Sequence, residues 1–426
     1  MSNLWYFGLA PQKSRYTEQL SKRWMPRAFN YVFNKSSNSW CDVEETTGVD
    51  LTKGLNDDVG TGVVLDDYSR VVHCYRQCEK FAMLISLGEV KNGDAIFLQD
   101  YWTPGIEGIL YSLSIRGISV RLYAMCHAQS VDVYDFTHAM AYWIRNAELS
   151  MDRYIEKNGG AIFVASSVHR RQLRDANFKA PIHVMGLPFD YYDVRPRSKD
   201  ALQPSRRQKK VVFASRMHPE KQPWFMLDVA EEVLKSQEDA RWVITTSAQD
   251  IQTSAELDKR LRERIASIRS SMNNRLEVRT GLSKEEYYQE LSTAMIIFNC
   301  SLQDYVSWTL LEGITHGCIP VYPNFRSFPE CLPEDFLYEH RDIHEFHVGE
   351  EFSCTFDAVC AINDIFGNGG DISPPDTALR CNVGRLLEAS IIDWELTNRR
   401  NMQKEQNVWE LPIDVVHLIG SRSRRR

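Results

Sequence analysis

Short apolar runs alternate along the chain with longer stretches of helical periodicity. The apolar runs fall into two sets, at residues 95–98, 120–124 and 161–164, and at residues 210–214, 241–245, 276–278, 295–298 and 319–322. Strands of a parallel sheet have this character because helices cover both faces of the sheet. Amphipathic stretches such as residues 223–235 and 284–293 lie between the runs. The alternation predicts an α/β protein with doubly wound parallel sheets.

The two sets of strands indicate two α/β domains. Residues 191–209 separate them and are rich in Pro, Arg, Ser and Asp, which is typical of an interdomain linker. We therefore expect a first domain over residues 1–190, a basic linker over 191–209 and a second domain over 210–376. Residues 350–375 contain many Gly, Asp and Pro residues, which predicts irregular structure. In residues 377–426 we expect a helix that crosses back to the first domain, followed by an arginine-rich tail.

The composition is that of a soluble globular protein. Of the 426 residues 43% are hydrophobic and 25% are charged. No apolar run has the length of a membrane span, and the N-terminus lacks the features of a signal peptide, so we expect a cytoplasmic protein, in the host cell if the source is viral. The ten cysteines form no CxxC pair, and Cys74 and Cys78 have no companion His/Cys pair. This pattern favours reduced thiols and predicts no metal site, zinc binding being the lesser alternative.

The net charge of −7 is unevenly distributed. Basic residues crowd the linker and its end, at Arg195, Arg197, Lys199, Arg206, Arg207, Lys209 and Lys210, and the chain ends with four arginines in its last five residues. Such local patches can contact phosphates even on an acidic protein. The alternative is a solvated linker and a frayed tail.

Two carboxylates, Asp304 and Glu312, flank the most informative segment of the chain. The residues between them favour a loop that opens a helix, so the N–H groups near Ser307, Trp308 and Thr309 would lie at a helix N-terminus. A diphosphate binds well at such a terminus, and a carboxylate on either side can accept hydrogen bonds from sugar hydroxyls. The alternative is a capped amphipathic helix with no ligand.

Two other loops of the second domain carry candidate ligand-binding residues. Arg216 and Lys221 follow the strand at 210–214, at the edge of the sheet where α/β proteins bind ligands. Both can hold a diphosphate, although such side chains are more often only solvated. Gly281 and Leu282 follow the strand at 276–278, and glycine permits an open backbone there. The same turn also suits a helix start capped by Ser283.

In this order the segments resemble retaining nucleotide-sugar glycosyltransferases with the GT-B fold. Residues 304–312 resemble the acidic signature of that family, with Asp304 in place of the usual glutamate. Residues 215–221 resemble its Arg-x4-Lys element, with Ser215 in place of the usual glycine. Residues 182–190 resemble its Ile-Pro-Asn-Gly-Val-Asp domain boundary, with Met185 in place of asparagine.

The resemblance implies two Rossmann-like domains that face a central cleft, and a role for each candidate residue. Glu312 would hold the ribose and Asp304 the hydroxyls of the donor sugar. The nucleotide base would lie against the backbone at Gly281 and Leu282. Arg216 and Lys221 would neutralise the leaving diphosphate, so no metal would be needed. The first domain would contribute three residues at strand ends, namely His127 near the donor sugar, Asp100 toward the acceptor and Gly8 in the loop under the sugar. His127 alone would more often be structural.

Finer similarities concern the acceptor. Residues 317–337 are similar to the tRNA-queuosine mannosyltransferase family, and His127, Tyr305 and residues 309–312 resemble phage α-glucosyltransferases of hydroxymethylcytosine DNA. Both families glycosylate a modified base, so the resemblance favours a hydroxylated base in DNA, and tRNA next, as acceptor. Trp102 or Trp143 could stack on an extruded base. The donor would be a UDP- or GDP-sugar, which is a co-substrate and not a cofactor.

Two alternatives to a nucleic-acid acceptor remain. One is a glycosyltransferase that acts on a saccharide or a lipid carrier. The other is a binding module for nucleotides or nucleic acid that has kept the fold and lost turnover. The sequence does not indicate an oligomeric state.

Overall fold

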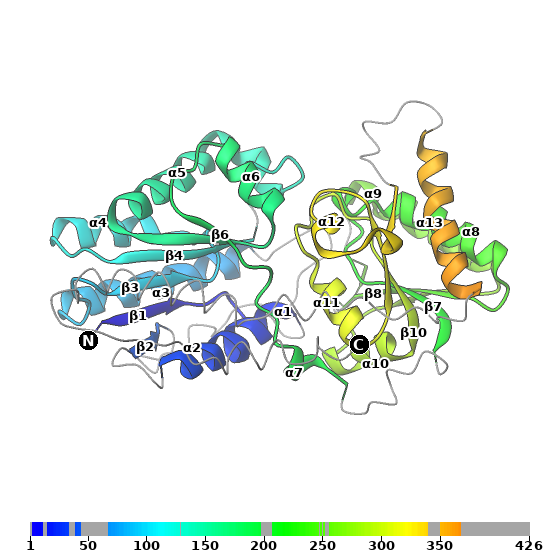
Figure 1. Cartoon of the computed structure of the whole chain (residues 1–426), viewed down its shortest axis with the longest axis horizontal. Coiled ribbons are helices and arrows are strands. Elements are labelled where there is room, and N and C mark those ends of the chain that lie inside the picture. The colour runs from blue at the N-terminus through cyan, green and yellow to red at the C-terminus, as the bar shows by residue number, and fades with distance from the viewer. Residues whose placement is uncertain are drawn as a thin grey trace, which may run out of the picture.

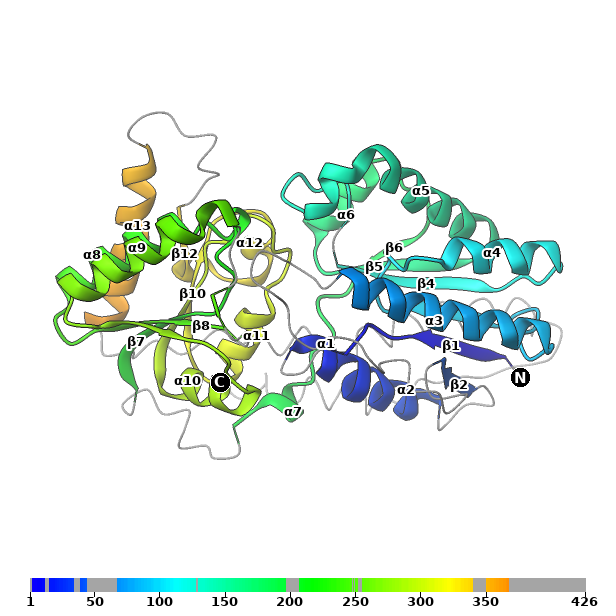
Figure 2. The same ribbon diagram turned by 180° about the vertical axis from the view of Figure 1, so that it is seen from behind.

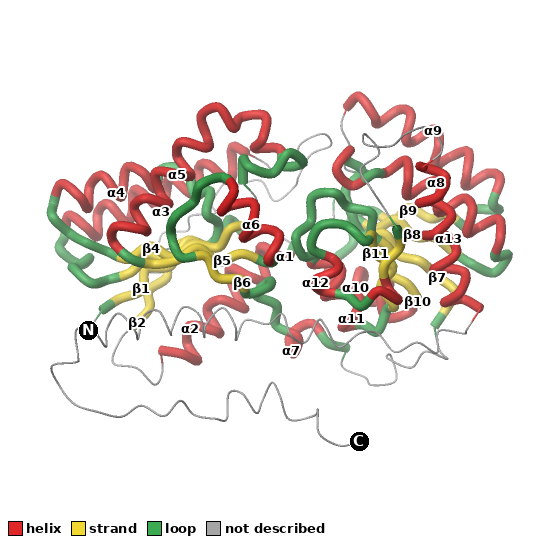
Figure 3. Tube along the Cα trace, turned by 45° about the horizontal axis from the view of Figure 1, so that its top comes forward, coloured by secondary structure: helices red, strands yellow, loops and turns green. Residues whose placement is uncertain are grey.

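The computed structural model describes residues 2–11, 15–33, 39–43, 67–127, 129–196, 207–246, 248, 250–251, 255–339 and 350–367. They form two lobes that lie side by side, each with a sheet between layers of helices (Figures 1 and 3). The helix α7 (Tyr191–Val194) lies on the segment that leaves the first lobe for the second, as Figure 2 shows from behind. The C-terminal stretch, residues 377–426, lies outside the described residues, so its helix stays a prediction.

The first lobe is built on a six-stranded parallel sheet with the order β2-β1-β3-β4-β5-β6. Its strands are β1 (Asn3–Phe7), β2 (Ser39–Asp42), β3 (Ala95–Leu98), β4 (Arg121–Cys126), β5 (Gly160–Val164) and β6 (Ile182–Val184). Its helices are α1 (Tyr16–Gln19), the π-helix η1 (Leu20–Trp24), α2 (Met25–Phe33), α3 (Asp67–Ser86), α4 (Ile106–Ile115), the 3-10 helix η3 (Phe136–Met140), α5 (Ala141–Asn158) and α6 (Ser167–Asp175).

The second lobe contains another six-stranded parallel sheet, with the order β12-β11-β10-β7-β8-β9. Its strands are β7 (Gln208–Phe213), β8 (Arg241–Thr245), β9 (Leu276–Arg279), β10 (Ala294–Phe298), β11 (Ile319–Pro323) and β12 (Leu337–Tyr338). Its helices are the 3-10 helix η6 (Pro219–Lys221), α8 (Pro223–Ser236), α9 (Ala255–Ser271), α10 (Lys284–Thr293), α11 (Trp308–Thr315), α12 (Phe328–Cys331), the 3-10 helix η7 (Glu334–Phe336) and α13 (Glu350–Gly367).

Apolar side chains cover both faces of the first sheet. Trp5 and Phe7 of β1 pack with α3 and α4 on one face, while Leu4 and Tyr6 pack with α2 on the other. This alternation follows from the two-residue period of a strand. Because both faces are covered, β3 is buried along its whole length, which explains its unbroken apolar sequence.

The predicted α/β class with doubly wound parallel sheets is confirmed, and each predicted apolar run lies on a strand. β7 begins at Gln208, two residues before the expected start of the second domain. No helix among the described residues is long and apolar enough to cross a bilayer.

The prediction of irregular structure over residues 350–375 is wrong for its first part. Residues 350–367 form α13, which packs on α8. Ala358, Ile362, Ile365 and Phe366 of α13 are buried in the core of the second lobe. Their spacing of three or four residues is that of one helix face, and the glycines and prolines that suggested a loop follow it, mainly beyond Phe366. Residues 368–375 lie outside the described part of the chain.

Candidate functional site

The strand orders place two ligand-binding positions at the middle of the molecule. In the second sheet the order reverses between β7 and β10, and the loops after these strands carry Arg216 and residues 299–307. In the first sheet it reverses between β1 and β3, which Gly8 and Asp100 follow closely. Open parallel sheets bind ligands beyond the carboxyl ends of their strands at such switch points. Arg216, Asp304, Gly8 and Asp100 therefore follow strands at the points where the topology favours binding.

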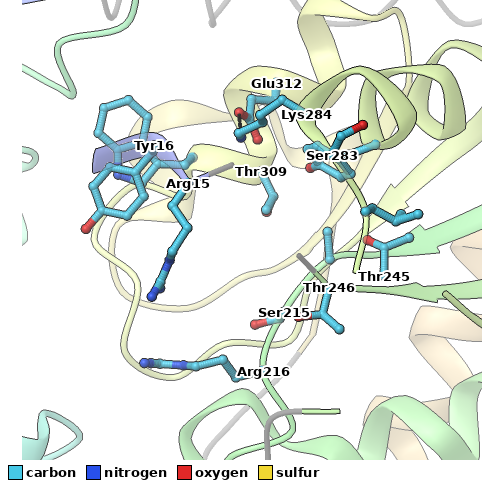
Figure 4. Close-up of a pocket in the computed structure, with 14 residues that line it drawn as sticks. Arg15, Tyr16, Ser215, Arg216, Thr245, Thr246, Ser283, Lys284, Thr309 and Glu312 are labelled. Carbon is cyan, nitrogen blue, oxygen red and sulfur yellow. Dashed lines mark hydrogen bonds and ion pairs between the residues drawn. The ribbon is translucent and has the colours of Figure 1, made fainter. Parts of the chain in front are cut away.

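A pocket lies at the switch point of the second sheet and is closed on one side by the first lobe (Figure 4). It is lined by Arg15, Tyr16, Ala214, Ser215, Arg216, Thr245, Thr246, Leu282, Ser283, Lys284, Tyr287, Trp308, Thr309 and Glu312. Five predicted site residues are thus brought together, namely Arg216, Leu282, Trp308, Thr309 and Glu312. Arg15 and Tyr16 come from the first lobe, about 290 residues before α11 in the chain.

The helix α11 presents its N-terminus to this pocket. Ser307 is the N-cap residue, but its side chain makes no capping hydrogen bond and instead contacts the hydroxyl of Thr309 at 2.7 Å. The first-turn N–H groups are therefore not occupied by a capping side chain, and Trp308 and Thr309 line the pocket. At its other end α11 is closed by Gly317, whose φ of 81° allows the bonds Gly317 N–H to Ile314 C=O and Cys318 N–H to Gly313 C=O. An anion placed at the N-terminus would meet open N–H donors.

Glu312 is the buried acid of the pocket, with 2% of its surface exposed. Lys284 forms an ion pair with its Oε1, and the Tyr288 hydroxyl donates to the same oxygen at 3.2 Å. Lys284 begins α10 directly after Ser283, whose side chain and that of Glu286 cap the helix reciprocally. The predicted cap at Ser283 is therefore confirmed, and it fixes the position of Lys284.

Lys221 and Asp304 are bound to each other beside the pocket. The Lys221 ammonium lies 2.7 Å from Asp304 Oδ1 and 2.9 Å from the Ser301 hydroxyl. The Lys221 side chain is buried, whereas about a quarter of the Asp304 side chain is exposed (24%). Neither residue is among those that line the pocket, so their assignment to the diphosphate and the sugar stays a prediction.

The loops that carry Arg216 and Gly281 have defined local structure. Arg216 pairs with Glu220 at 2.9 Å and is one-fifth exposed (20%), and its guanidinium reaches into the pocket (Figure 4). Gly281 has a φ of 66°, a left-handed conformation that favours glycine, and its N–H donates to the Ala248 carbonyl at 2.6 Å. Leu282 follows it in the pocket wall.

The three predicted residues of the first lobe lie outside the pocket lining. Asp100 accepts hydrogen bonds from Arg70 at 2.6 Å and from the Trp102 N–H at 3.0 Å. His127 Nε2 donates to the Gln99 carbonyl at 2.9 Å, and burial lowers the pKa of His127, so its imidazole is neutral at pH 7. Gly8 offers its carbonyl to Gln77 at 3.0 Å. Their roles toward sugar and acceptor stay predictions.

The basic residues at the end of the linker have partners in the second lobe, and contact of this segment with phosphates stays a prediction. Arg207 donates to the carbonyls of Ala294 and His316, and Lys210 is buried 3.0 Å from Glu290. Lys209 lies 3.2 Å from Asp239. Residues 197–206 and the arginine tail lie outside the described residues.

Several pocket residues were not found from the sequence. Arg15 and Tyr16 carry no motif, and only the docking of the lobes brings them to the pocket. Lys284 could have been found, because it directly follows Ser283 in a segment that was already recognised. Within the described part of the chain, no group of three or more His, Cys, Asp or Glu side chains lies close enough to hold a metal ion.

Comparisons with solved structures identify the architecture. The chain superimposes on sucrose-phosphate synthase from Thermosynechococcus elongatus with a TM-score of 0.58 and 11% identity, over 95% of this chain and 99% of that one. It superimposes on Anabaena HepE in complex with UDP-glucose with a TM-score of 0.55 and 12% identity, over 95% of this chain and 100% of that one. The chain has the GT-B fold. At this identity the likeness establishes the GT-B fold alone.

Comparison of the sequence with curated proteins gives one match over a shorter part of the chain. The chain is 23% identical over 128 residues to a tRNA-queuosine alpha-mannosyltransferase of Drosophila melanogaster. The match covers 30% of this chain and spans only 32% of the curated relative. No protein-family model matches the chain.

Proposed function

We propose that the chain is a retaining glycosyltransferase that moves a sugar from a nucleoside diphosphate sugar to a hydroxyl group. The observation that carries the proposal is the pocket at the switch point of the second sheet, where Arg216, the N-terminus of α11 and Glu312 lie together. Guanidinium and helix N–H groups bind a diphosphate, and a buried carboxylate accepts hydrogen bonds from ribose hydroxyls. UDP and GDP are the expected donor nucleotides, and the HepE structure holds UDP-glucose.

Charge stabilisation is the main contribution of the protein to the proposed reaction. The bond between the anomeric carbon and the diphosphate oxygen breaks, and the negative charge that develops on the diphosphate meets Arg216, Lys221 and the N-terminus of α11. The acceptor hydroxyl attacks from the same face, and its proton passes to the departing phosphate oxygen. Because fixed cations supply the positive charge, the reaction is proposed to proceed without a divalent metal.

The proposed acceptor is a hydroxyl on a base of a nucleic acid. On the first lobe Trp102 and Trp143 lie edge to face at 5.7 Å, and 44% of Trp143 is exposed. The backbone N–H of Trp102 donates to the side chain of Asp100, so this aromatic pair adjoins the predicted acceptor side. Aromatic side chains stack on unpaired bases. The sequence favours a hydroxymethylpyrimidine in DNA, and the match to a tRNA-queuosine mannosyltransferase supports tRNA as the next candidate.

The test is to incubate the protein with UDP- and GDP-sugars and either hydroxymethylpyrimidine DNA or tRNA, and to analyse the nucleosides by mass spectrometry. A sugar mass on a nucleoside from one substrate is expected. Donor hydrolysis without modification of either nucleic acid would point to a saccharide or lipid acceptor instead. Binding of the donor without release of free sugar would indicate a binding module. Failure to bind any nucleotide sugar would contradict the proposal.

A further inference from the structure

Arg15 enters the pocket from the first lobe. Figure 4 shows its side chain reaching into the same side of the pocket as the guanidinium of Arg216, which comes from the second lobe. Both residues line the pocket, together with Lys284 at the start of α10. The pocket is therefore faced by cationic side chains from both lobes, although its other candidate ligands all lie on the second.

The segment that follows Arg15 is docked on the second lobe by specific contacts. The ring of Tyr16 stacks on Trp308 of α11, with centroids 4.8 Å apart and an angle of 15° between the planes. Gln19 Nε2 donates to the Tyr288 hydroxyl at 3.0 Å, and Tyr288 in turn donates to Glu312. The contacts hold Arg15 next to the N-terminus of α11, so its position is set by both lobes.

Three cationic side chains, Arg15, Arg216 and Lys284, line the pocket, and Arg216 is paired with Glu220 at 2.9 Å. Burial lowers the pKa of Arg15, and the nearby charge of Arg216 lowers it as well, against an opposing effect of Tyr16. Among the residues that line the pocket, Glu312 is the single carboxylate, and it is paired with Lys284. An anion with oxygens on two sides can accept hydrogen bonds from both guanidinium groups.

We propose that Arg15 binds the diphosphate of the nucleotide sugar opposite Arg216, so that both lobes hold the donor. The inference rests on the proposed function for the class of ligand. In this inference the first lobe contacts the phosphates of the donor through Arg15, and Arg15 does not contact the nucleoside. Loss of Arg15 should therefore weaken binding of nucleoside diphosphates and leave binding of nucleosides nearly unchanged.

Calorimetry on the full chain tests this with four probes, namely UDP, GDP, uridine and guanosine. Arg15→Gln is expected to lower the affinity for whichever nucleoside diphosphate binds the wild type by about 10- to 100-fold. This is the range of one charge-assisted hydrogen-bonding contact. Arg15→Lys, which keeps the charge but not the planar fork, should lose less. Arg23→Gln is the matched control, since Arg23 lies on the same helical segment, is half exposed (49%) and pairs with Asp193 outside the pocket.

The outcomes separate this inference from the proposed function. If the wild-type protein binds UDP or GDP and Arg15→Gln binds it equally well, the inference fails and the proposed function stands. If Arg15→Gln loses diphosphate and nucleoside to the same extent, Arg15 shapes the pocket and does not contact phosphate, which also overturns the inference. If the wild-type protein binds no nucleotide, the proposed function itself fails. Circular dichroism of each variant shows whether it is folded.

Discussion

Glu312 and Asp304 flank the same short segment but have different surroundings. Glu312 is buried in the pocket and oriented by Lys284 and Tyr288, so its carboxylate is fixed before any ligand arrives. Asp304 is more exposed and is held by Lys221, one of the cations expected to face the leaving diphosphate. We infer that Glu312 acts in binding the nucleotide. Asp304 would bind the hydroxyls of the sugar and at the same time hold Lys221, which would face the departing diphosphate.

Substitutions of these two acids should separate the two effects. Glu312→Gln should weaken binding of the nucleoside diphosphate by about 10- to 100-fold, because a charged hydrogen-bond acceptor is replaced by a neutral one. Asp304→Asn should lower kcat for transfer more than it weakens binding of the nucleoside diphosphate, since the sugar hydroxyls and the Lys221 ammonium lose the carboxylate that would orient them. Alanine at either position should abolish transfer in a protein that stays folded. Glu232→Ala, at an exposed glutamate on α8, is the control, and full turnover in both alanine variants would refute the site assignment.

His169 gives the protein a dependence of stability on pH. It is fully buried, its ring stacks on Tyr305 at 3.9 Å and its Nε2 bonds the Gln129 side chain at 2.6 Å. Burial, followed by the charges of His127 and Arg326, lowers the pKa of His169 from 6.5 to about 3. Below pH 6.5 the unfolded chain therefore binds a proton that the folded protein does not bind.

The free energy of unfolding should consequently fall as the pH drops from 6.5 toward 3, by up to about 1.4 kcal/mol per pH unit from this group. In His169→Gln the decline between pH 6.5 and about pH 5 should be shallower than in the wild type, because one proton-binding group of the unfolded chain is gone. Urea titrations at several pH values measure both slopes. Equal slopes would show that His169 is protonated in the folded protein.

At the scale of elements, α11 is the helix that connects the core to the pocket. Gly313 lies against β10, where a Cβ atom would come within 2.8 Å of the Ile297 side chain. The absence of a side chain lets α11 lie close to β10, next to Glu312 and about one and a half turns from the pocket end of the helix. In contrast, a Cβ at Gly108 in the exposed part of α4 would meet nothing within 4 Å.

These two glycines should respond oppositely to the same substitution. Gly108→Ala should stabilise the protein by about 0.5–1 kcal/mol, because alanine has the higher helix propensity. Gly313→Ala gains the same propensity but overpacks the contact with Ile297, which typically costs about 1–3 kcal/mol, so a net loss is expected. Thermal unfolding measures both. A Gly313→Ala variant as stable as Gly108→Ala would mean that α11 is not closely packed on β10.

At the scale of the whole molecule, a buried polar interface joins the lobes beside the pocket. Arg326 of the second lobe forms a two-pronged ion pair with Asp132 of the first, and the side chains are 7% and 0% exposed. Gln303, next to Asp304, donates to Asp135 at 2.7 Å, and Tyr305 stacks on His169. The loop that carries Asp304 is thus held by the first lobe, and the relative position of the lobes bears directly on the site.

Removal of one partner of this ion pair should open the interface. Arg326→Met leaves Asp132 buried without its cation, which typically costs about 3–5 kcal/mol, so the variant should unfold earlier and have a larger radius of gyration in small-angle scattering. Arg171→Met is the control, because Arg171 is two-thirds exposed (66%) and lies 3.9 Å from Glu330 in the same interface. If the two variants behaved alike, the buried pair would not hold the lobes together.

Local pattern alone predicted much of the molecule. The apolar runs identified the strands because burial on both faces of a parallel sheet requires an unbroken apolar sequence. Ser283 and Glu286 marked the start of α10, since a capping box is a property of four consecutive residues. Arg216, Thr309 and Glu312 were assigned to one site by the order of their segments, which resembles that of GT-B glycosyltransferases, and all three line the pocket. In residues 350–375, however, the glycines and prolines concealed the buried helix face of α13.

Only the tertiary structure decided which distant side chains complete the pocket. Arg15 and Tyr16 meet Trp308 through the docking of two lobes, and the pairs Lys284–Glu312 and Lys221–Asp304 depend on strand order and loop geometry. Hydrophobic periodicity is a local property that states which face of an element is buried but not what covers it. The sequence by itself therefore determined most of the strands and five residues of the pocket wall in the second lobe, whereas the contribution of the first lobe followed from long-range packing.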